Sequence, residues 1–313
     1  MNLDLLENFC KEKEIPFKKG EPMDRHTTFR VGGKADVMLW PNSAEAMKET
    51  LLFCREQKIP AAVIGRGSNL LVSDDGVEGA VVSTDGLNRL EITGQTVTAE
   101  AGVPLSALAA AAAKAGLSGL EFAYGIPGSV GGALCMNAGA YGSEIRDVVT
   151  RAGAVDASGK VFEIPVSEMR LSYRASRFRA EGLTVLWARF SLQPGNPESI
   201  TEKMQEFLRR RREKQPLEYP SAGSTFKRPE GRFAGALIEQ NGWKGKGVGD
   251  AVVSEKHAGF VINRGHATAR EILALIQKIE DSVLKHDGVR LEPEVIFLGR
   301  KSEKSESSLK TSI

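Results

Sequence analysis

The stretch Gly125-Ile-Pro-Gly-Ser-Val-Gly-Gly-Ala-Leu-Cys-Met-Asn-Ala-Gly-Ala-Tyr-Gly142 decides how the rest of the chain is interpreted. It contains six glycines, three alanines and no charged residue, so it presents almost no side-chain bulk. Glycine loses more conformational entropy on folding than any other residue, so such a run needs positive φ angles or a ligand close to the backbone. Bare backbone N–H groups hold phosphate oxygens or the edge of a flat ring. The alternative is a tightly packed turn between two helices.

A second glycine run, Gly65-Arg-Gly-Ser-Asn-Leu-Leu-Val-Ser-Asp-Asp-Gly76, follows the apolar segment 60–64. It again places glycines, a hydroxyl and an amide at the end of an expected strand. The segment 65–70 is not a dinucleotide fingerprint, because it lacks the third glycine and no helix begins there. Two such loops favour a cofactor that carries phosphate and is held at two ends.

Composition narrows the class of protein. The chain has 313 residues, enough for two or three domains, and its formal net charge of +2 provides no strongly basic field for nucleic acid. Cys10, Cys54 and Cys135 form no Cys-x-x-Cys pair, which is typical of a reducing compartment and predicts a cytosolic protein. No stretch approaches the roughly 18 apolar residues of a membrane span, and no histidine pair has metal-ligand spacing. We therefore expect no membrane, metal or nucleic-acid partner, and no obligate protein partner is evident.

Local patterns predict alternating helices and strands. Amphipathic spacing and capping residues predict helices over 2–13, 43–57, 105–115, 199–214, 232–240 and 268–286. Apolar runs predict strands over 35–40, 61–64, 79–83, 90–93, 96–100, 148–155, 160–165, 183–192 and 290–298. The turns at 94–95 and 156–159 predict two hairpins, and the strands 61–64 and 79–83 belong to a predicted β-α-β unit. The five alanines 109–113 predict that the helix 105–115 packs closely. Ser199 with Glu202 and Thr268 with Glu271 have the spacing of capping boxes, and 194–197 is typical of a linker. The four arginines at 209–212 form either a solvated helix end or a polyanion site.

Seven short runs, in order along residues 24–299, together indicate a family. They are Thr27-Thr-Phe-Arg-Val-Gly-Gly33, Gly65-Arg-Gly-Ser-Asn-Leu-Leu71, 125–132 with 137–142, Tyr173-Arg174-x-Ser176-x-Phe178, Gly223-Ser-Thr-Phe-Lys227, 253–260 and Leu291-Glu-Pro-Glu-Val295. In this combination the chain resembles the UDP-N-acetylenolpyruvoylglucosamine reductases of bacterial peptidoglycan synthesis, usually called MurB. It resembles their shorter class, because Arg177 and Leu183 leave no room for the inserted tyrosine-bearing loop of the longer class.

The resemblance implies an α+β fold. Its larger part is the two-part FAD-binding fold of vanillyl-alcohol oxidase or PCMH type, and a smaller α+β domain binds substrate. The implied limits are 1–85, rejoined by 289–300, for the first FAD-binding subdomain and 86–197 for the second. Residues 198–288 form the substrate-binding domain, and 301–313 form a disordered tail.

The resemblance also implies the activity of a UDP-N-acetylmuramate dehydrogenase with non-covalent FAD and NADPH. It reduces UDP-N-acetylglucosamine enolpyruvate to UDP-N-acetylmuramate: hydride from flavin N5 adds to the vinyl carbon, and a serine then delivers a proton. Charge that develops beside the substrate carboxylate must be met by positive groups or proton donors. By resemblance, Arg174 and Glu294 meet that charge, and Ser224 is the proton donor. An apolar strand favours a raised pKa for the Glu294 carboxyl, and Glu292 stays open as the alternative.

The expected ligand-binding residues come from the glycine runs and from nearby basic and aromatic residues. Those for FAD are Gly65, Gly67, Ser68, Asn69, Gly125, Pro127, Gly128, Ser129, Gly131, Gly132, Asn137, Ala138 and Gly139. Those for substrate are Tyr173, Arg211, Lys214 and Lys227. Arg211 and Lys214 are three residues apart on one helical face and are assigned to the UDP diphosphate.

Other interpretations stay open. Arg174 has an alternative as a surface partner of Glu181, Glu294 as an exposed strand end, and Ser224 as a turn hydroxyl. The chain is also compatible with another FAD-linked oxidase or dehydrogenase of the same fold with a different substrate. A nucleotide-binding regulator without chemistry would keep the glycine loops but has no need for the three catalytic candidates together.

Overall fold

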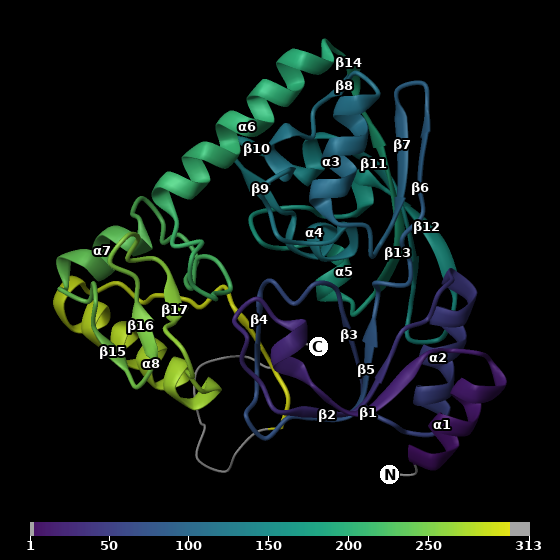
Figure 1. Cartoon of the computed structure of the whole chain (residues 1–313), viewed down its shortest axis with the longest axis horizontal. Helices are drawn as coiled ribbons and strands as arrows, with labels where there is room; N and C mark the ends of the chain where they lie inside the picture. The colour runs from purple at the N-terminus through teal and green to yellow at the C-terminus, as the bar shows by residue number, and fades with distance from the viewer. Residues whose placement is uncertain (1–2, 301–313) are drawn as a thin grey trace. The chain divides into compact units, whose positions relative to one another are not determined.

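The computed structural model describes residues 3–300, so the predicted disordered tail lies outside the described residues. The chain divides into two compact units (Figure 1). Unit 1 comprises Met1–Lys19, Val37–Arg66 and Gly79–Arg211, and unit 2 comprises Gly20–Asp36, Gly67–Glu78 and Arg212–Ile313. The domain limits predicted from the sequence differ from this division and stay a prediction. No helix among residues 3–300 is both long enough and apolar enough to cross a membrane.

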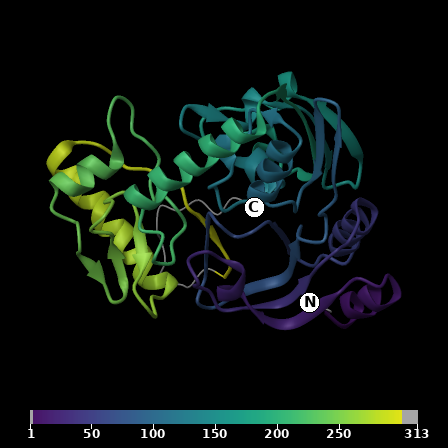
Figure 2. The ribbon, with the colours of Figure 1, turned by 45° about the horizontal axis from the view of Figure 1, so that its top comes forward.

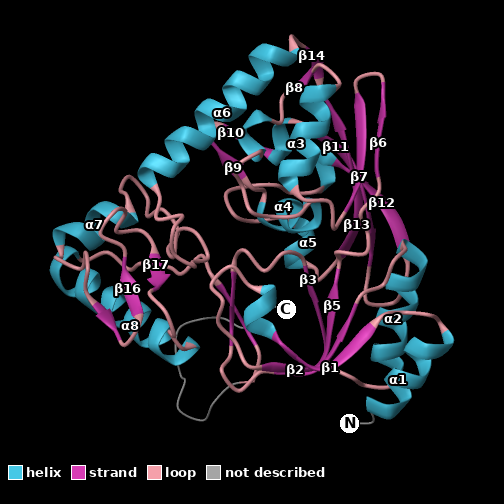
Figure 3. Ribbon diagram, in the orientation of Figure 1, coloured by secondary structure: helices cyan, strands magenta, loops and turns pink. Residues whose placement is uncertain are grey.

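Helices and strands alternate along the chain (Figure 3). The helices are α1 (Leu3–Glu12), α2 (Ala44–Glu56), α3 (Leu105–Lys114), α4 (Val130–Met136), α5 (Arg177–Ala180), α6 (Pro197–Lys214), α7 (Ala234–Gln240) and α8 (Ala269–Asp287). The strands are β1 (Phe17–Pro22), β2 (Lys34–Leu39), β3 (Ala61–Ile64), β4 (Leu70–Val72), β5 (Val77–Ser83), β6 (Leu90–Thr93), β7 (Thr96–Glu100), β8 (Leu117–Ser118), β9 (Gly139–Ala140), β10 (Ser143–Glu144), β11 (Val149–Val155), β12 (Val161–Pro165), β13 (Thr184–Ser191), β14 (Gln193–Pro194), β15 (Gly247–Val248), β16 (Ala251–Val253), β17 (Val261–Asn263) and β18 (Ile296–Leu298).

A five-stranded sheet of order β12-β11-β13-β7-β6 forms the centre of unit 1. Its strands pair antiparallel, and the two predicted hairpins, β6 with β7 and β11 with β12, are confirmed. Helix α4 packs against β7 and β13, and α3 lies beside it (Figure 1 and Figure 2). Alanines Ala109, Ala112 and Ala113 of α3 are buried, so this helix packs closely, as its composition predicts.

A four-stranded sheet of order β1-β2-β5-β3 contains the predicted β-α-β unit. Strands β3 and β5 are parallel, with Ala61 opposite Ala80. The helix that precedes β3 begins as predicted, because the Ser43 hydroxyl accepts a 3.1 Å hydrogen bond from the Ala46 N–H. Strands β1, β2 and β5 each contain residues of both units.

Unit 2 is built around the sheet β15-β16-β17 and the long helix α8. Helix α8 begins with the predicted capping box, in which Thr268 accepts from the Glu271 N–H and Glu271 accepts from the Thr268 N–H. It ends at Gly288, whose φ of +67° is left-handed. A buried side of α8 that includes Ile272, Leu275 and Ile279 contributes to the hydrophobic core of this unit.

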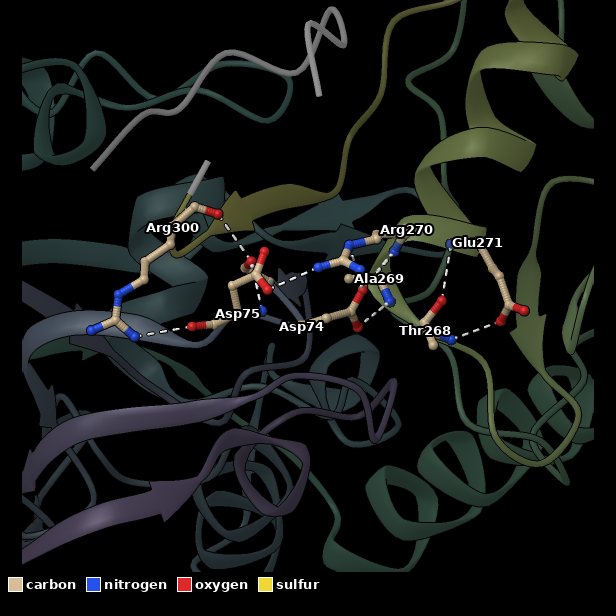
Figure 4. Close-up of polar contacts among 8 residues, drawn as sticks. Asp74, Asp75, Thr268, Ala269, Arg270, Glu271 and Arg300 are labelled. Atoms are coloured by element: carbon tan, nitrogen blue, oxygen red, sulfur yellow. Dashed lines mark hydrogen bonds and ion pairs between the residues drawn. The ribbon is translucent and has the colours of Figure 1, made fainter. Parts of the chain in front are cut away.

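An acidic loop completes the cap of α8 (Figure 4). Asp74 accepts hydrogen bonds from the Ala269 N–H at 2.7 Å and the Arg270 N–H at 3.0 Å. Asp75 pairs with the Arg270 side chain at 2.8 Å, and its carbonyl oxygen accepts from Arg300 at 2.9 Å. The loop after β4 is therefore bound both to the start of α8 and to the residues that follow β18.

Two sequence predictions about element ends are wrong. Helix α6 begins at Pro197, and the Asn196 side chain accepts from the N–H groups of Glu198 and Ser199, so the cap is Asn196 and not the predicted Ser199 box. The predicted strand 290–298 is reduced to β18, since Pro293 cannot donate to a ladder.

Several elements were not predicted, among them α4, β1 and β4. Helix α4 lies inside the glycine stretch, because Val130, Ala133 and Leu134 are buried against the sheet and this burial outweighs the poor helix propensity of glycine. Strands β1 and β4 were also missed, and β4 lies within the second glycine run.

Candidate active site

Two buried hydroxyls in unit 1 mark the expected cofactor loop. The side chains of Ser129 and Thr84 are almost fully buried, and neither hydroxyl has a hydrogen-bond partner among the described residues. A Cβ added to Gly65 would lie 2.4 Å from the Ser129 Oγ and 3.8 Å from the Thr84 Oγ1. Burying a hydroxyl without a partner costs free energy, so these groups call for an acceptor. A phosphate oxygen fits this donor set, and Thr84 is a candidate that the sequence analysis missed.

The glycines of the first run have different physical roles. A Cβ on Gly131 would lie 3.0 Å from the Cβ of Ala101, so this glycine allows close packing. Gly132 is exposed, and within 4 Å its added Cβ would meet only the Ser129 Oγ, at 3.7 Å. Gly132 therefore leaves an open surface beside the buried hydroxyl, which is the arrangement that a flat or phosphate-bearing ligand needs.

Asn137 ends helix α4 and connects it to the turn that carries Arg174. Its φ of 41° is left-handed, and its side chain donates to the Ser172 carbonyl at 3.3 Å. The main chains of Ser172 and Ala175 exchange two hydrogen bonds, which closes a tight turn around Tyr173 and Arg174. The guanidinium of Arg174 lies 5.3 Å from the Tyr173 ring. The glycine stretch thus holds the turn that carries Arg174, because the Asn137 side chain is hydrogen bonded to the main chain of Ser172.

Arg211 lies against the same glycine stretch. A Cβ on Gly125 would lie 3.3 Å from the Arg211 Cδ, and burial lowers the pKa of the guanidinium. No carboxylate pairs with Arg211 within residues 3–300. A half-buried cation that no carboxylate of the described residues pairs with favours an anionic ligand. Arg211 therefore differs from Arg209 and Arg210, which pair with a carboxylate.

The neighbouring Arg209 and Arg210 pair with a carboxylate of their own helix. Glu206 pairs with Arg209 at 2.8 Å and with Arg210 at 2.7 Å, and these hydrogen bonds lower its pKa to about 2. Arg209 and Arg210 therefore correspond to the solvated alternative of the sequence analysis. Lys214, the other residue assigned to the diphosphate, is exposed at the end of α6.

Backbone hydrogen bonds in unit 2 link the segment that contains Ser224 to the segment that contains Glu294. The Glu294 N–H donates to the Thr225 carbonyl at 2.8 Å, and the Lys227 N–H donates to the Glu292 carbonyl at 2.8 Å. Glu294 is only 9% exposed, so its interpretation as an exposed strand end is wrong. Glu292 lies at the surface and pairs with the Lys227 ammonium at 2.9 Å. Ser224 itself is exposed, which a proton donor to a bound substrate requires.

Thr225 holds this arrangement and was missed by the sequence analysis. Its side chain is fully buried, its N–H donates to the Gly259 carbonyl at 2.8 Å, and its hydroxyl accepts from the Val261 N–H at 3.0 Å. The only sign of its role in the sequence is its position between Ser224 and Lys227, two predicted site residues. Thr225 therefore links three segments, which are the run 223–227 (the serine run), the segment around Gly259 and the run 291–295 (the glutamate run).

The second glycine run has a packing role at its start and a polar role at its end. A Cβ on Gly67, whose φ is +60°, would lie 1.9 Å from the His26 carbonyl oxygen, so this position requires glycine regardless of any ligand. The Ser68 carbonyl accepts from the Thr28 hydroxyl at 3.4 Å. The Asn69 side chain donates to the Glu294 carbonyl at 3.0 Å. The amide expected to bind cofactor is thus engaged with the protein.

His257 lies in the segment that pairs with Thr225. Its Nδ1 accepts a 3.0 Å hydrogen bond from the Gly259 N–H, and its ring contacts that of Phe260 edge-on. Burial lowers the pKa of His257, with the Lys244 ammonium acting in the same direction. The imidazole is therefore neutral near pH 7. Within residues 3–300, no three His, Cys, Asp or Glu side chains are grouped to hold a metal ion.

Comparison with known proteins defines the class first. The FAD binding domain family matches residues 35–165, which include both buried hydroxyls and the whole glycine stretch 125–142. The chain therefore contains an FAD-binding domain, and the orphaned hydroxyls, Gly65 and Gly132 provide donors and space that suit this cofactor. The family of UDP-N-acetylenolpyruvoylglucosamine reductase C-terminal domains matches residues 215–298.

Relatives over nearly the whole chain identify the family. The UDP-N-acetylenolpyruvoylglucosamine reductase of Clostridium novyi is 49% identical, covering 95% of this chain and 96% of the relative. That of Caldanaerobacter subterraneus is 46% identical, covering 96% and 98%. The crystal structure of the Thermus caldophilus enzyme is 34% identical with a TM-score of 0.77, covering 91% of this chain and 98% of that one. The chain belongs to the UDP-N-acetylenolpyruvoylglucosamine reductase family, and the predicted family and α+β fold class are confirmed.

Proposed function

We propose that this chain is a UDP-N-acetylmuramate dehydrogenase, which reduces UDP-N-acetylglucosamine enolpyruvate to UDP-N-acetylmuramate for peptidoglycan synthesis. Its membership of the reductase family and its FAD-binding domain support this proposal. The observation that carries the catalytic assignment is the 2.8 Å hydrogen bond from the Glu294 N–H to the Thr225 carbonyl. Through this bond Glu294 is linked directly to Thr225, the residue that follows the expected proton donor, Ser224.

Each proposed catalytic side chain has one task. FAD, when bound, supplies the hydride for the enolpyruvyl double bond. Ser224 donates its Oγ proton to the substrate carbon next to the carboxylate, where negative charge develops. The buried Glu294 carboxyl and the Arg174 guanidinium stabilise that charge. Because the intermediate is carbanionic, it is basic enough to take a proton from a hydroxyl.

The remaining polar groups hold the ligands. Ser129 and Thr84 donate to a cofactor phosphate, and the open backbone at Gly132 allows its close approach. Arg211 binds the substrate diphosphate, since its half-buried charge has no carboxylate partner among the described residues. Lys214, at the end of the same helix, supplies a second charge.

NADPH is the proposed electron donor and the cytoplasm the proposed location. The donor follows from the family to which the chain belongs. The location is supported by three free cysteines, which a reducing compartment keeps as thiols. The product would feed the cell wall on which cell shape and division depend.

An anaerobic absorbance titration tests the proposal. NADPH should bleach the flavin band of the purified protein, and UDP-N-acetylglucosamine enolpyruvate should then restore it. Bleaching that only oxygen reverses would reject this substrate and favour a flavin oxidase. Absence of any turnover would favour a nucleotide-binding regulator.

The variant Ser224→Ala separates the two half-reactions. Bleaching by NADPH should stay nearly unchanged, whereas the return of the band should slow by about 10²-fold or more, because only that step needs the proton. Ser199→Ala, which changes an exposed serine of α6, is the matched control. Equal losses in both half-reactions would assign Ser224 a structural role.

A further inference from the structure

We propose that Asn69 is a positioning residue for Glu294, so that its amide serves the catalytic acid and not the flavin. The proposal rests on the proposed function, because it assumes that Glu294 acts on the substrate. It concerns a residue of the Gly65–Leu71 run, which by sequence alone is expected to bind cofactor. Asn69, β4 and the glutamate run all belong to unit 2.

Asn69 makes two hydrogen bonds to the chain on the C-terminal side of Glu294. Its Nδ2 donates to the Glu294 carbonyl oxygen at 3.0 Å. Its own carbonyl oxygen accepts from the Ile296 N–H at 2.9 Å. One residue thus holds both the peptide group that follows Glu294 and the N–H of Ile296. Without the Asn69 side chain, the Glu294 carbonyl would lose this donor.

The Glu294 backbone has a second fixed point on its other side. Its N–H donates to the Thr225 carbonyl at 2.8 Å. The bond from Asn69 therefore completes a clamp, with one hydrogen bond on the N–H and one on the carbonyl of the same residue. Since φ and ψ of Glu294 lie between these two bonds, the clamp fixes the direction in which its side chain leaves the backbone.

The clamp is needed because ladder pairing begins only beyond the glutamate. The parallel pairing of β18 with β4 starts at Ile296, opposite Leu70. Pro293 has no N–H and is joined to Phe226 only by an isolated bridge. Glu294 thus lies between the isolated bridge at Pro293 and the ladder that begins at Ile296, and it belongs to no strand itself. The Asn69 side chain replaces the missing bond.

Removal of this side chain should affect one half-reaction. In Asn69→Ala the Glu294 carboxyl loses its fixed direction, and a displacement of about 1 Å at a reacting group costs up to roughly 10²-fold in rate. We expect reoxidation of the flavin by UDP-N-acetylglucosamine enolpyruvate to slow by about 10- to 100-fold. Flavin content and bleaching by NADPH should change by less than about threefold, because the amide is not a flavin ligand.

The substitution Asn69→Asp sharpens the test. It retains the size of the side chain but replaces the N–H donor with an oxygen, which faces the Glu294 carbonyl and repels it. Reoxidation should therefore be at least as slow as in Asn69→Ala. The matched control is Asn241→Ala, because the Asn241 amide also donates to a backbone carbonyl, that of Leu237 at 2.9 Å, in the same unit. It should leave both half-reactions unchanged.

A readout without turnover keeps the inference separate from the proposed function. Loss of the clamp should speed amide hydrogen exchange at Glu294 and Ile296 by roughly 10-fold in Asn69→Ala, with the rest of the chain unchanged. Unchanged exchange would overturn the inference, and so would a parallel loss of flavin and of both half-reactions. If exchange speeds up while Glu294→Gln reoxidises normally, the clamp is real and the catalytic role of Glu294 is what fails.

Discussion

The N–H of Glu294 donates a 2.8 Å hydrogen bond to the carbonyl oxygen of Thr225, the neighbour of Ser224. Two runs that are far apart in the sequence are thereby joined beside the isolated bridge between Phe226 and Pro293. The proposed proton donor is exposed, whereas the proposed acid is buried. This difference suits their tasks, because the donor must reach the substrate and a carboxyl next to developing negative charge acts best where water is excluded.

Ser129→Ala should weaken FAD binding without destabilising the protein that lacks FAD. The hydroxyl is buried and has no partner among the described residues, so its removal from the FAD-free protein should be neutral or stabilising. The loss of one hydrogen bond to a charged phosphate should weaken FAD binding by roughly 10-fold or more. Fluorescence titration with FAD and urea unfolding measure the two effects.

Ser176→Ala is the control for that experiment. The Ser176 hydroxyl is also buried but donates to the Cys135 carbonyl at 2.8 Å. Its removal should destabilise the FAD-free protein by about 1 kcal/mol. If Ser129→Ala proved equally destabilising and bound FAD normally, the hydroxyl would be structural.

Arg211→Ala should raise the KM for the UDP substrate by roughly 10-fold or more, since a half-buried, charge-assisted contact to phosphate is lost. Flavin content should not change. Arg212→Ala is the matched control, because Arg212 is an exposed neighbour on the same helix. Steady-state kinetics and the ratio of flavin to protein absorbance measure both quantities. Loss of bound flavin in Arg211→Ala would contradict the assignment.

Asp74→Asn should destabilise unit 2 through the start of α8. The Asp74 carboxylate accepts from both the Ala269 and Arg270 N–H groups, which the helix itself cannot satisfy (Figure 4). Loss of the charge and of one acceptor should lower the free energy of unfolding by about 1 kcal/mol. Urea denaturation of the purified protein measures this change.

Asp75→Asn provides the comparison for the cap. Asp75 makes an exposed pair with the Arg270 side chain, which is 65% exposed, so its loss should cost about 0.5 kcal/mol or less. Equal effects of the two substitutions would mean that the cap of α8 does not depend on Asp74.

Protonation of His257 should make the protein less stable as the pH falls below neutrality. Burial lowers its folded pKa below the unfolded value of 6.5, so the folded state favours neutral imidazole. The stability from this group is present above pH 6.5 and is lost as the pH falls from 6.5 through the folded pKa. Protonation would also remove the acceptor for the Gly259 N–H. Thermal unfolding between pH 7.5 and about 5 measures the slope.

His257→Gln should flatten this pH dependence, whereas His286→Gln, at an exposed position, should leave it unchanged. An identical slope in wild type and His257→Gln would show that other groups control acid stability.

Short-range signals allowed much of the secondary structure to be predicted from the sequence. The capping box of Thr268 and Glu271 and the left-handed Gly288 define α8 because every partner lies within four residues. The hairpin of β6 and β7 follows in the same way from Gly94 and Gln95 between alternating residues. The start of α6 was also encoded locally, by Asn196 and Pro197, but these residues were interpreted as a linker.

The sequence by itself determined the family, the helices and hairpins with local signals, and the residue types available for chemistry. Only the tertiary structure decided that the Asn69 amide reaches Glu294, that Thr84 lies near Ser129 around Gly65, and that α4 forms within a glycine run. The physical reason is the range of the interactions. A cap or a hairpin turn joins neighbours, whereas these contacts join segments that meet only after the chain has buried its apolar surface and satisfied its backbone elsewhere.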